Sequence, residues 1–429
     1  MRRLLPVLLA ITLHFLRLGA VEMATDTAVA SAIHAKASQD FISYIDENGE
    51  EQSLEWACDT ITENTTTLTP GWWIASRDVI AYHRIEIVGT VNLILADGYT
   101  LNAMAGIHAD KTTRFNIYGQ RKGTGTLLAT GTAYGAGIGG KIHEESGIFT
   151  INGGIIYAVG DQDGAGIGGG ANSNWSGEFG NNQQVIINGG TVYAHSPGNG
   201  TGIGGGGTSS AIYVIYPGAG GEITINGGQV IATSSGGYGM GPGISPCGFA
   251  GKDGIISLSW RNCGDYAYAS SYRGQVNFNK AFAIEGGTTL ATPETADGKM
   301  LKAAHKITFT DNDGQSIVAT KATTAGNSFP TNDIPVKMKG YKAEWLLDGK
   351  FYDFRQIPTD DLNLVATEWI LRGDIDNDEN IDVSDINILI NIILSNCESG
   401  VYERRAYITD DYEIDVTDVN TLINIILNR

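Results

Sequence analysis

Carboxylates recur at regular spacing near the carboxyl end of the sequence. They stand at the first, third, fifth, ninth and twelfth positions of one stretch, as Asp374, Asp376, Asp378, Asp382 and Asp385. Ca²⁺ prefers six to eight oxygen ligands, and an EF-type loop supplies oxygens at this spacing. The pattern therefore predicts a calcium-binding loop. An acidic, solvated tail without a metal is the alternative interpretation.

An amphipathic helix is expected directly after this loop. Apolar residues recur there at i, i+3, i+4 and i+7, as Ile386, Leu389, Ile390 and Ile393. The loop-and-helix pattern returns 33 residues later, over residues 414–418, with Val419, Leu422, Ile423 and Ile426 in the apolar positions. A duplicated loop and helix of this kind resembles the dockerin type I module, here over residues 372–429.

The resemblance implies which residues hold calcium. In the first loop it assigns side-chain ligands to Asp374, Asp376, Asp378, Asp382 and Asp385, and a backbone carbonyl ligand to Asn380. The sixth position, usually Gly, is Glu379, which we expect to strain the loop.

The second loop departs further from the pattern. Tyr407 replaces the first Asp and Thr409 the third-position ligand, so that only Asp411, Asp415 and Asp418 remain well placed. We expect this loop to bind calcium weakly or not at all.

The resemblance also implies a protein partner. Dockerin helices bind cohesin modules, and the pairs Ser384–Asp385 and Thr417–Asp418 fall where the family's recognition residues lie. Two alternatives stay open: these residues cap their helices, or the tail is an internal calcium clip that closes the end of its own chain.

The middle of the chain is a repeat. Ile-Asn-Gly-Gly recurs around Asn152, Asn188 and Asn226, which lie 36 and 38 residues apart, between strand-like runs of alternating Ile, Val, Thr and Tyr. Such units gain a core only by stacking, so we predict a right-handed parallel β-helix or similar β-solenoid over residues 67–285, with an amide ladder of the three asparagines.

Glycine-rich elements separate these units, at residues 135–139, 164–168, 200–204 and, more weakly, 239–243. We interpret them as turns. They have the glycine spacing of a dinucleotide-binding loop, but no helical pattern follows them, which argues against nucleotide binding.

The segment Trp72–Leu101 and the repeats after it resemble β-helical surface proteins of gut bacteria, over residues 67–245. Aromatic side chains of the repeats could stack on sugar rings or serve only as ladder and turn residues; they are Tyr134, Tyr157, Trp175, Tyr193, Tyr213, Tyr216 and Tyr238. Acids inside the repeats are sparse and unpaired in sequence, so we expect no catalysis, with a polysaccharide lyase or hydrolase as the alternative.

The sequence pattern changes near residue 300. Gly340–Tyr341, Trp345, Asp353–Phe354 and a closing Leu-x-Leu at 362–364 resemble the internalin B-repeat. The resemblance implies a small β-grasp-like module at residues 300–368 with Trp345 in its core. Such a module acts as a spacer between domains or in adhesion.

Charge and the amino-terminal segment limit the function. The chain of 429 residues has 47 acidic and 28 basic residues, a net charge of −19, which disfavours nucleic acid as a partner. Arg2 and Arg3 precede an apolar run at 4–13, which predicts a signal peptide at residues 1–20, followed by a lead-in or cap at 21–66. No later stretch is long enough to span a membrane.

Together these features predict a mainly β, secreted or cell-surface protein. We expect the solenoid to bind glycans or act as an adhesin within a polysaccharide-degrading system, and the calcium-dependent tail to bind a cohesin-like partner. A purely structural adhesin remains an alternative.

Overall fold

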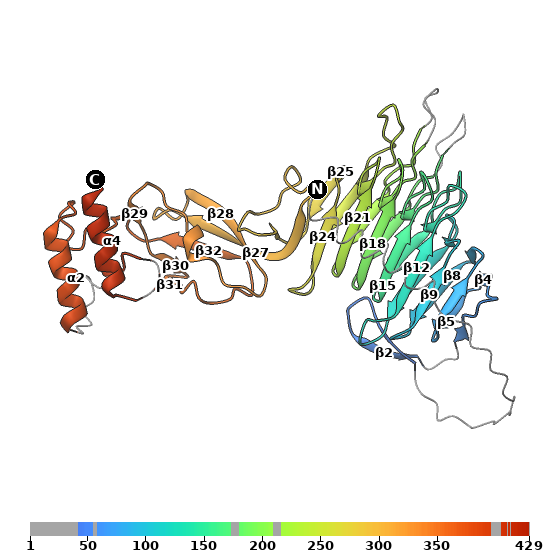
Figure 1. Ribbon diagram of the computed structural model, residues 1–429, viewed down its shortest axis with the longest axis horizontal. Helices are drawn as coiled ribbons and strands as arrows, with labels where there is room; N and C mark the ends of the chain where they lie inside the picture. The colour runs from blue at the N-terminus through green and yellow to red at the C-terminus, as the bar shows by residue number, and fades with distance from the viewer. Residues whose placement is uncertain are drawn as a thin grey trace, which may run out of the picture. The chain divides into compact units, whose positions relative to one another are not determined.

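The computed structural model describes residues 42–54, 58–172, 180–208, 216–395, 405–409, 411 and 413–428 (Figure 1). The expected signal peptide lies outside the described residues. The described chain is mainly β, and two helices with defined bounds lie in its last part. Among the residues that the structure describes, no helix combines the length and the apolar character needed to cross a bilayer.

Three parallel sheets dominate the first part of the chain. Sheet I consists of β4 (Thr67–Leu68), β7 (Ile85–Ile87), β10 (Ile107–His108), β13 (Ile138–Gly139), β16 (Ile167–Gly168), β19 (Ile203–Gly204) and β22 (Met240–Gly241). Sheet II consists of β3 (Asp59–Thr60), β5 (Gly71–Ala75), β8 (Thr90–Leu95), β11 (Arg114–Gly119), β14 (Ile148–Ile151), β17 (Gln184–Ile187), β20 (Glu222–Ile225), β23 (Gly254–Leu258) and β25 (Gly274–Phe278). The parallel strands of sheet III are β6 (Val79–Ala81), β9 (Thr100–Ala103), β12 (Thr126–Thr130), β15 (Ile155–Val159), β18 (Thr191–Ser196), β21 (Gln229–Ser234) and β24 (Tyr266–Ala269).

From β4 to β24 the chain visits sheets I, II and III in turn, and each strand pairs with its counterpart in the next repeat. One repeat of 36 or 38 residues is thus one passage through all three sheets. The parallel sheets are compatible with the expected β-solenoid. The first strand of sheet II, β3, begins at Asp59, before the boundary at residue 67 that we expected.

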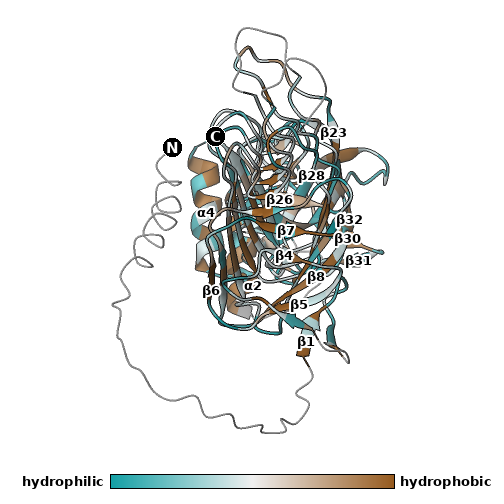
Figure 2. Cartoon of the chain, turned by 90° about the vertical axis from the view of Figure 1, so that its right-hand side faces the viewer, coloured by the Kyte–Doolittle hydropathy of each residue, from teal (hydrophilic) through white to brown (hydrophobic). Residues whose placement is uncertain are grey.

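The interior is built from columns of aliphatic side chains. Ile107, Ile138, Ile167 and Ile203 face one another in consecutive strands of sheet I and are at most 1% exposed. Alternation along the longer strands directs one residue inward and the next outward, and Figure 2 shows the hydrophobic segments along the strands. Stacking these columns removes apolar area from water, which a single repeat cannot do.

The predicted amide ladder is confirmed. Asn188 donates through Nδ2 to Oδ1 of Asn152 at 2.8 Å, and Asn226 donates in the same way to Asn188 at 2.8 Å. Each amide follows a strand of sheet II, so the ladder fixes three successive repeats in register.

The glycine-rich elements are not only turns, as we had expected, because each contains a short strand of sheet I. Gly139, Gly168, Gly204 and Gly241 have φ values between +135° and +140°. A Cβ atom at Gly139 would lie 1.9 Å from the carbonyl oxygen of Gly168. Glycine at this position therefore allows strands of two residues to stack directly on one another.

At the amino-terminal side, β1 (Ile42–Ile45) and β2 (Glu51–Leu54) form an antiparallel hairpin. Leu54 packs in a small core with Ile74 and Ile94 of sheet II. The described part of the expected 21–66 segment thus covers one outer face of this sheet.

A long strand connects the repeats to the next module. The first half of β27 (Met300–Thr310) extends sheet III antiparallel to β24 and also pairs with β26 (Phe282–Ile284). Its second half pairs with β28 (Ile317–Thr324) and with β32 (Leu362–Ala366). The remaining elements are β30 (Trp345–Leu347), β31 (Lys350–Phe351), β29 (Tyr341–Lys342), β33 (Ile370–Leu371) and a 3₁₀ turn (Thr331–Asp333).

This module has its own aromatic core. Phe309, Phe329, Trp345 and Phe354 pack together with Leu364. Trp345 is 3% exposed, which confirms its predicted place in the core.

The tail contains α2 (Val383–Ser395) and α4 (Val416–Leu427). Their apolar faces share a core that includes Leu389 and Leu422, together with Ile375 and Ile408 from the loop before each helix. The tail is therefore a folded unit in which both helices position their loops.

Candidate metal centre

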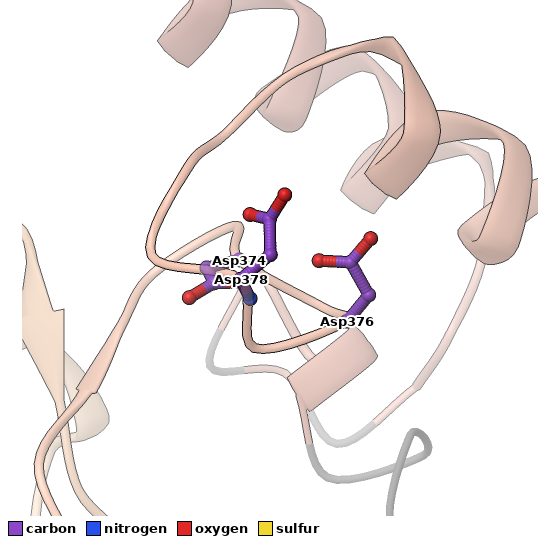
Figure 3. A group of neighbouring side chains, drawn as sticks. All are labelled: Asp374, Asp376 and Asp378. Carbon is purple, nitrogen blue, oxygen red and sulfur yellow. The ribbon is translucent and has the colours of Figure 1, made fainter.

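Three carboxylates converge in the loop that precedes α2. One oxygen from each of Asp374, Asp376 and Asp378 lies within 4.8 Å of the others (Figure 3). Asp374 is 3% exposed, Asp376 is half-buried and Asp378 is exposed. These three residues are the first, third and fifth positions of the predicted calcium loop.

Backbone amides curl the loop around Asp374. Its Oδ1 accepts a hydrogen bond from Asp378 N and its Oδ2 accepts one from Glu379 N, both at 3.1 Å. Asp378 Oδ1 accepts from Asn380 N at 2.8 Å. The loop is therefore folded tightly enough to direct several carboxylates toward one point.

Asp385 closes the loop onto the helix. It is 1% exposed, and its Oδ1 accepts from Ile375 N at 2.7 Å and from Asp376 N at 3.4 Å. Its Oδ2 accepts from Asp382 N at 2.9 Å. Asp382 in turn accepts from Ser384 N at 2.7 Å at the start of α2. Asp382 and Asp385 thus cap the helix as well as belonging to the predicted ligand set.

The side chain of Asp376 has a buried oxygen whose burial is not offset by a hydrogen bond in the described chain. Its Oδ1 is buried and has no hydrogen-bond partner in the described part of the chain. Burial raises the pKa of this carboxyl group above its ordinary value, and the nearby charges of Asp378 and Asp385 raise it further. A buried, unpaired carboxylate oxygen is costly. A divalent cation would remove that cost, so the donor set fits a hard, oxygen-preferring ion.

Backbone strain accompanies the loop. Asn377 and Glu379 have φ values of +64° and +65°. Asn enters this region readily, whereas a residue such as Glu does so at a cost of roughly 1–2 kcal/mol. The strain expected from Glu at the sixth position is confirmed.

The second loop has the same arrangement before its helix, but in the described part of the chain its acidic side chains do not converge as those of the first loop do. Asp418 is fully buried, and its Oδ1 accepts from Ile408 N at 2.9 Å, from Thr409 N at 2.8 Å and from Thr409 Oγ1 at 3.0 Å. Asp415 caps α4, and Asp411 is exposed and accepts from Glu413 N at 3.0 Å. The three predicted ligands are therefore engaged by the backbone of their own loop.

Two cations contact this second loop that the sequence did not indicate. Arg372 Nη1 donates to the carbonyl oxygen of Ile408 at 2.6 Å, and Lys342 Nζ donates to that of Tyr407. Both donors come from residues next to β33 or within β29. In the first loop, Arg405 Nη1 likewise donates to the carbonyl oxygen of Asp374, at 3.3 Å. Both loops are thus held at a backbone carbonyl by a basic side chain.

The predicted partner-binding residues divide into two groups. Asp385 and Asp418 are at most 1% exposed and hold the loops closed, whereas Ser384 and Thr417 are exposed. Ile390 and Ile423, which the periodicity placed in the apolar faces of the helices, are exposed, so that part of the prediction is wrong. Exposed apolar side chains share the same spacing in both helices: Val383, Ile390 and Leu394 in α2, and Val416, Ile423 and Leu427 in α4.

Among the aromatic residues considered for sugar stacking, Tyr157 and Tyr193 face each other in adjacent strands of sheet III. Their rings are 4.8 Å apart and 6° from parallel. Tyr216 is exposed, and Tyr134 and Tyr238 are half-buried outside the strands. Trp175 and Tyr213 lie outside the described residues.

A charged cluster in sheet I was not foreseen. Nδ1 of His108 contacts Glu86, and its Nε2 lies 2.6 Å from Oε2 of Glu144. Lys141 Nζ lies 2.9 Å from Oε1 of Glu86. Although burial opposes it, the hydrogen bonds from Lys141 and His108 lower the pKa of Glu86 below its ordinary value. Contacts among these side chains link consecutive repeats of the solenoid-like part.

No protein family, no curated protein and no solved structure matches this chain.

Proposed function

We propose that this chain is a secreted or cell-surface, non-catalytic protein whose tail is a calcium-dependent docking module. The observation that carries the proposal is the buried, unpartnered Oδ1 of Asp376 beside the carboxylates of Asp374 and Asp378. Calcium would be held by these three side chains together with Asp382, Asp385 and the carbonyl of Asn380. When bound, the ion supplies positive charge that offsets carboxylate repulsion and favours the closed loop.

The docking role is supported by what the closed loop does to α2. Asp385 ties the loop to the first turn of the helix, so that calcium binding would fix the helix and its exposed side chains. Val383, Ser384 and Leu394 are then available to a partner, with Val416, Thr417 and Leu427 as the equivalent set on α4. We infer a dockerin-like module and a cohesin-like partner with a complementary apolar surface.

For the repeating part we propose a β-solenoid that binds glycans. Support for the solenoid comes from the order in which the strands visit the three sheets. Support for glycan binding comes from the described parallel strands of sheet III, which contain no charged residue. The non-catalytic assignment rests on the scarcity of acids in the repeats. The solenoid would then display a binding surface, and the module at 300–368 would separate it from the tail.

The test of docking is thermal unfolding of the full chain, followed by circular dichroism at 222 nm, with excess Ca²⁺ and with a chelator. Calcium should raise the midpoint of the helical transition in the parent chain. Asp376→Asn should lose most of that shift, and Asp411→Asn, which alters an exposed acid of the second loop, should keep it. Identical melts of the parent chain under both conditions would refute the proposal.

A further inference from the structure

The parallel strands of sheet III carry no charged residue. From β6 to β24, these described strands contain no Asp, Glu, Lys or Arg, although the chain has a net charge of −19. Figure 1 shows β9, β12, β15, β18, β21 and β24 side by side. A neutral surface of this extent on so acidic a chain selects against charged ligands, because a neutral face provides no counter-charge.

One row of side chains runs across this face from strand to strand. Strand register places one residue of each strand in line, and we name these the apolar row: Ile80, Asn102, Leu128, Tyr157, Tyr193, Ile231 and Tyr268. Ile80 is exposed, Leu128 is buried, and the others are half-buried. Neighbouring strands lie about 4.8 Å apart, so the row extends over roughly 29 Å. Its centre is the parallel pair of Tyr157 and Tyr193. The row is therefore long, narrow and aromatic in the middle.

Neutral hydrogen-bonding groups line both sides of the row. On one side the register aligns Thr100, Thr126, Thr191 and Gln229, with Ile155 between the second and the third of them. On the other side it aligns Thr130, His195 and Thr233, with Val159 after Thr130 and with His195 Nδ1 at 2.9 Å from Thr233 Oγ1. Burial lowers the pKa of His195, which favours the neutral form of its ring. Hydroxyl, amide and imidazole groups can donate and accept hydrogen bonds without charge.

A cation lies on β27, next to β24, and it is already engaged. Lys302 of β27 lies with Nζ 4.5 Å from the ring centroid of Tyr266 and 3.6 Å from Oε1 of Glu285. An acidic polysaccharide would therefore meet no free cation along the parallel strands of this face.

We propose that the apolar row binds one neutral, extended glycan chain that lies across the strands. This inference rests on the proposed glycan binding and specifies its face and its substrate class. The rings of Tyr157 and Tyr193 stack on each other, so a sugar would meet their outer edges and hydroxyl groups. The apolar C–H face of a sugar ring would pack on these edges and on the aliphatic side chains of the row, and its hydroxyl groups match the threonine, glutamine and histidine side chains beside the row. The repeat of the strands offers equivalent contacts to successive sugars.

The test is affinity electrophoresis of the full chain in native gels that contain one polysaccharide each. Mixed-linkage β-glucan, xyloglucan and galactomannan are the neutral probes, and polygalacturonate is the acidic probe. At least one neutral probe should retard the parent chain. Tyr157→Ala with Tyr193→Ala should weaken binding at least tenfold, and Gln229→Glu, which adds one charge beside the row with little change in shape, should weaken it as well.

Phe249→Ala is the control, because Phe249 is an exposed aromatic residue outside the row, and it should bind as the parent chain does. Circular dichroism reports whether each variant folds. If the double variant does not fold, Gln229→Glu still tests whether the row is the binding site.

Failure of the inference differs from failure of the proposed function. If no polysaccharide retards the parent chain, glycan binding itself is wrong. If a neutral glycan retards the parent chain and the folded row variants equally, the protein binds glycans elsewhere and the row is not the site. Equal retardation by polygalacturonate would overturn the neutral class. If the parent chain sediments as a dimer and the row variants sediment as monomers, the row binds a second copy of this chain and not a glycan.

Discussion

Asp376 and Thr409 occupy the same position in the two loops of the tail, but only Thr409 is satisfied within the protein. Its hydroxyl donates to Oδ1 of Asp418 at 3.0 Å, whereas Oδ1 of Asp376 is buried without a partner among the described residues. The carboxylate leaves a negative charge for a cation to balance, while the hydroxyl replaces the cation with a hydrogen bond. The two loops thus share a frame and differ in whether a hydrogen bond within the described chain satisfies the side chain at this position.

The strain at Glu379 predicts a stabilising substitution. Glu379→Gly should stabilise the calcium-bound tail by about 1 kcal/mol, because glycine adopts φ near +65° without the cost paid by a side chain. The measurement is the midpoint of thermal unfolding of the full chain in excess calcium.

Asn377→Gly is the control for this prediction. Asn377 has nearly the same φ of +64°, but Asn tolerates it, so the change should be much smaller. Equal gains from both substitutions would show that strain at Glu379 is not the cause.

The charged cluster of sheet I predicts a pH dependence. The pKa of Glu86 is lowered in the folded chain, so its ionised form adds stability above the usual glutamate value of 4.5, and this is lost as the pH falls through the lowered pKa. Glu86→Gln should lower the unfolding midpoint at pH 7, and the difference from the parent should vanish at strongly acidic pH.

Glu222→Gln serves as the comparison for this pH dependence, because Glu222 is exposed and accepts one hydrogen bond from Gln184 at 2.8 Å. Its effect at pH 7 should be small. A difference between Glu86→Gln and the parent that persists undiminished into acid would argue against a role of ionised Glu86.

The amide ladder predicts unequal costs for two similar substitutions. Asn188 bonds to both Asn152 and Asn226, so Asn188→Ala should break two hydrogen bonds and destabilise the chain by about 2–3 kcal/mol. Asn226→Ala breaks one of these bonds and should cost about half as much. Denaturant titration monitored by tryptophan fluorescence compares the two, and equal costs would count against a cooperative ladder.

Identical residue types at a fixed period explain why the ladder was predictable. Three asparagines in the same local sequence indicated equivalent places in successive repeats. The cluster of Glu86, His108 and Glu144 was not predictable, because its members differ in type and lie 22 and 36 residues apart. Only strand register brings them together. The strands of sheet I were also missed, since an Ile-Gly pair flanked by glycine has the composition of a turn.

In the tail, too, part of the site was predictable from the sequence and part was not. Spacing alone brought Asp374, Asp376 and Asp378 into one predicted site, and they converge. Spacing does not specify how many hydrogen bonds each carboxylate already accepts. Asp385 receives three backbone N–H groups, whereas Asp376 Oδ1 receives none in the described chain. That difference depends on loop conformation, and it makes Asp376 Oδ1 the oxygen that a bound cation would stabilise most.

Calcium titration by calorimetry tests the central claim most directly, with the full chain at pH 7 after removal of divalent ions. We predict heat from a single site per chain, at least tenfold weaker binding for Asp376→Asn, and unchanged binding for Asp411→Asn. Absence of heat in the parent chain, or binding that Asp376→Asn leaves intact, would contradict the claim that the first loop closes around calcium.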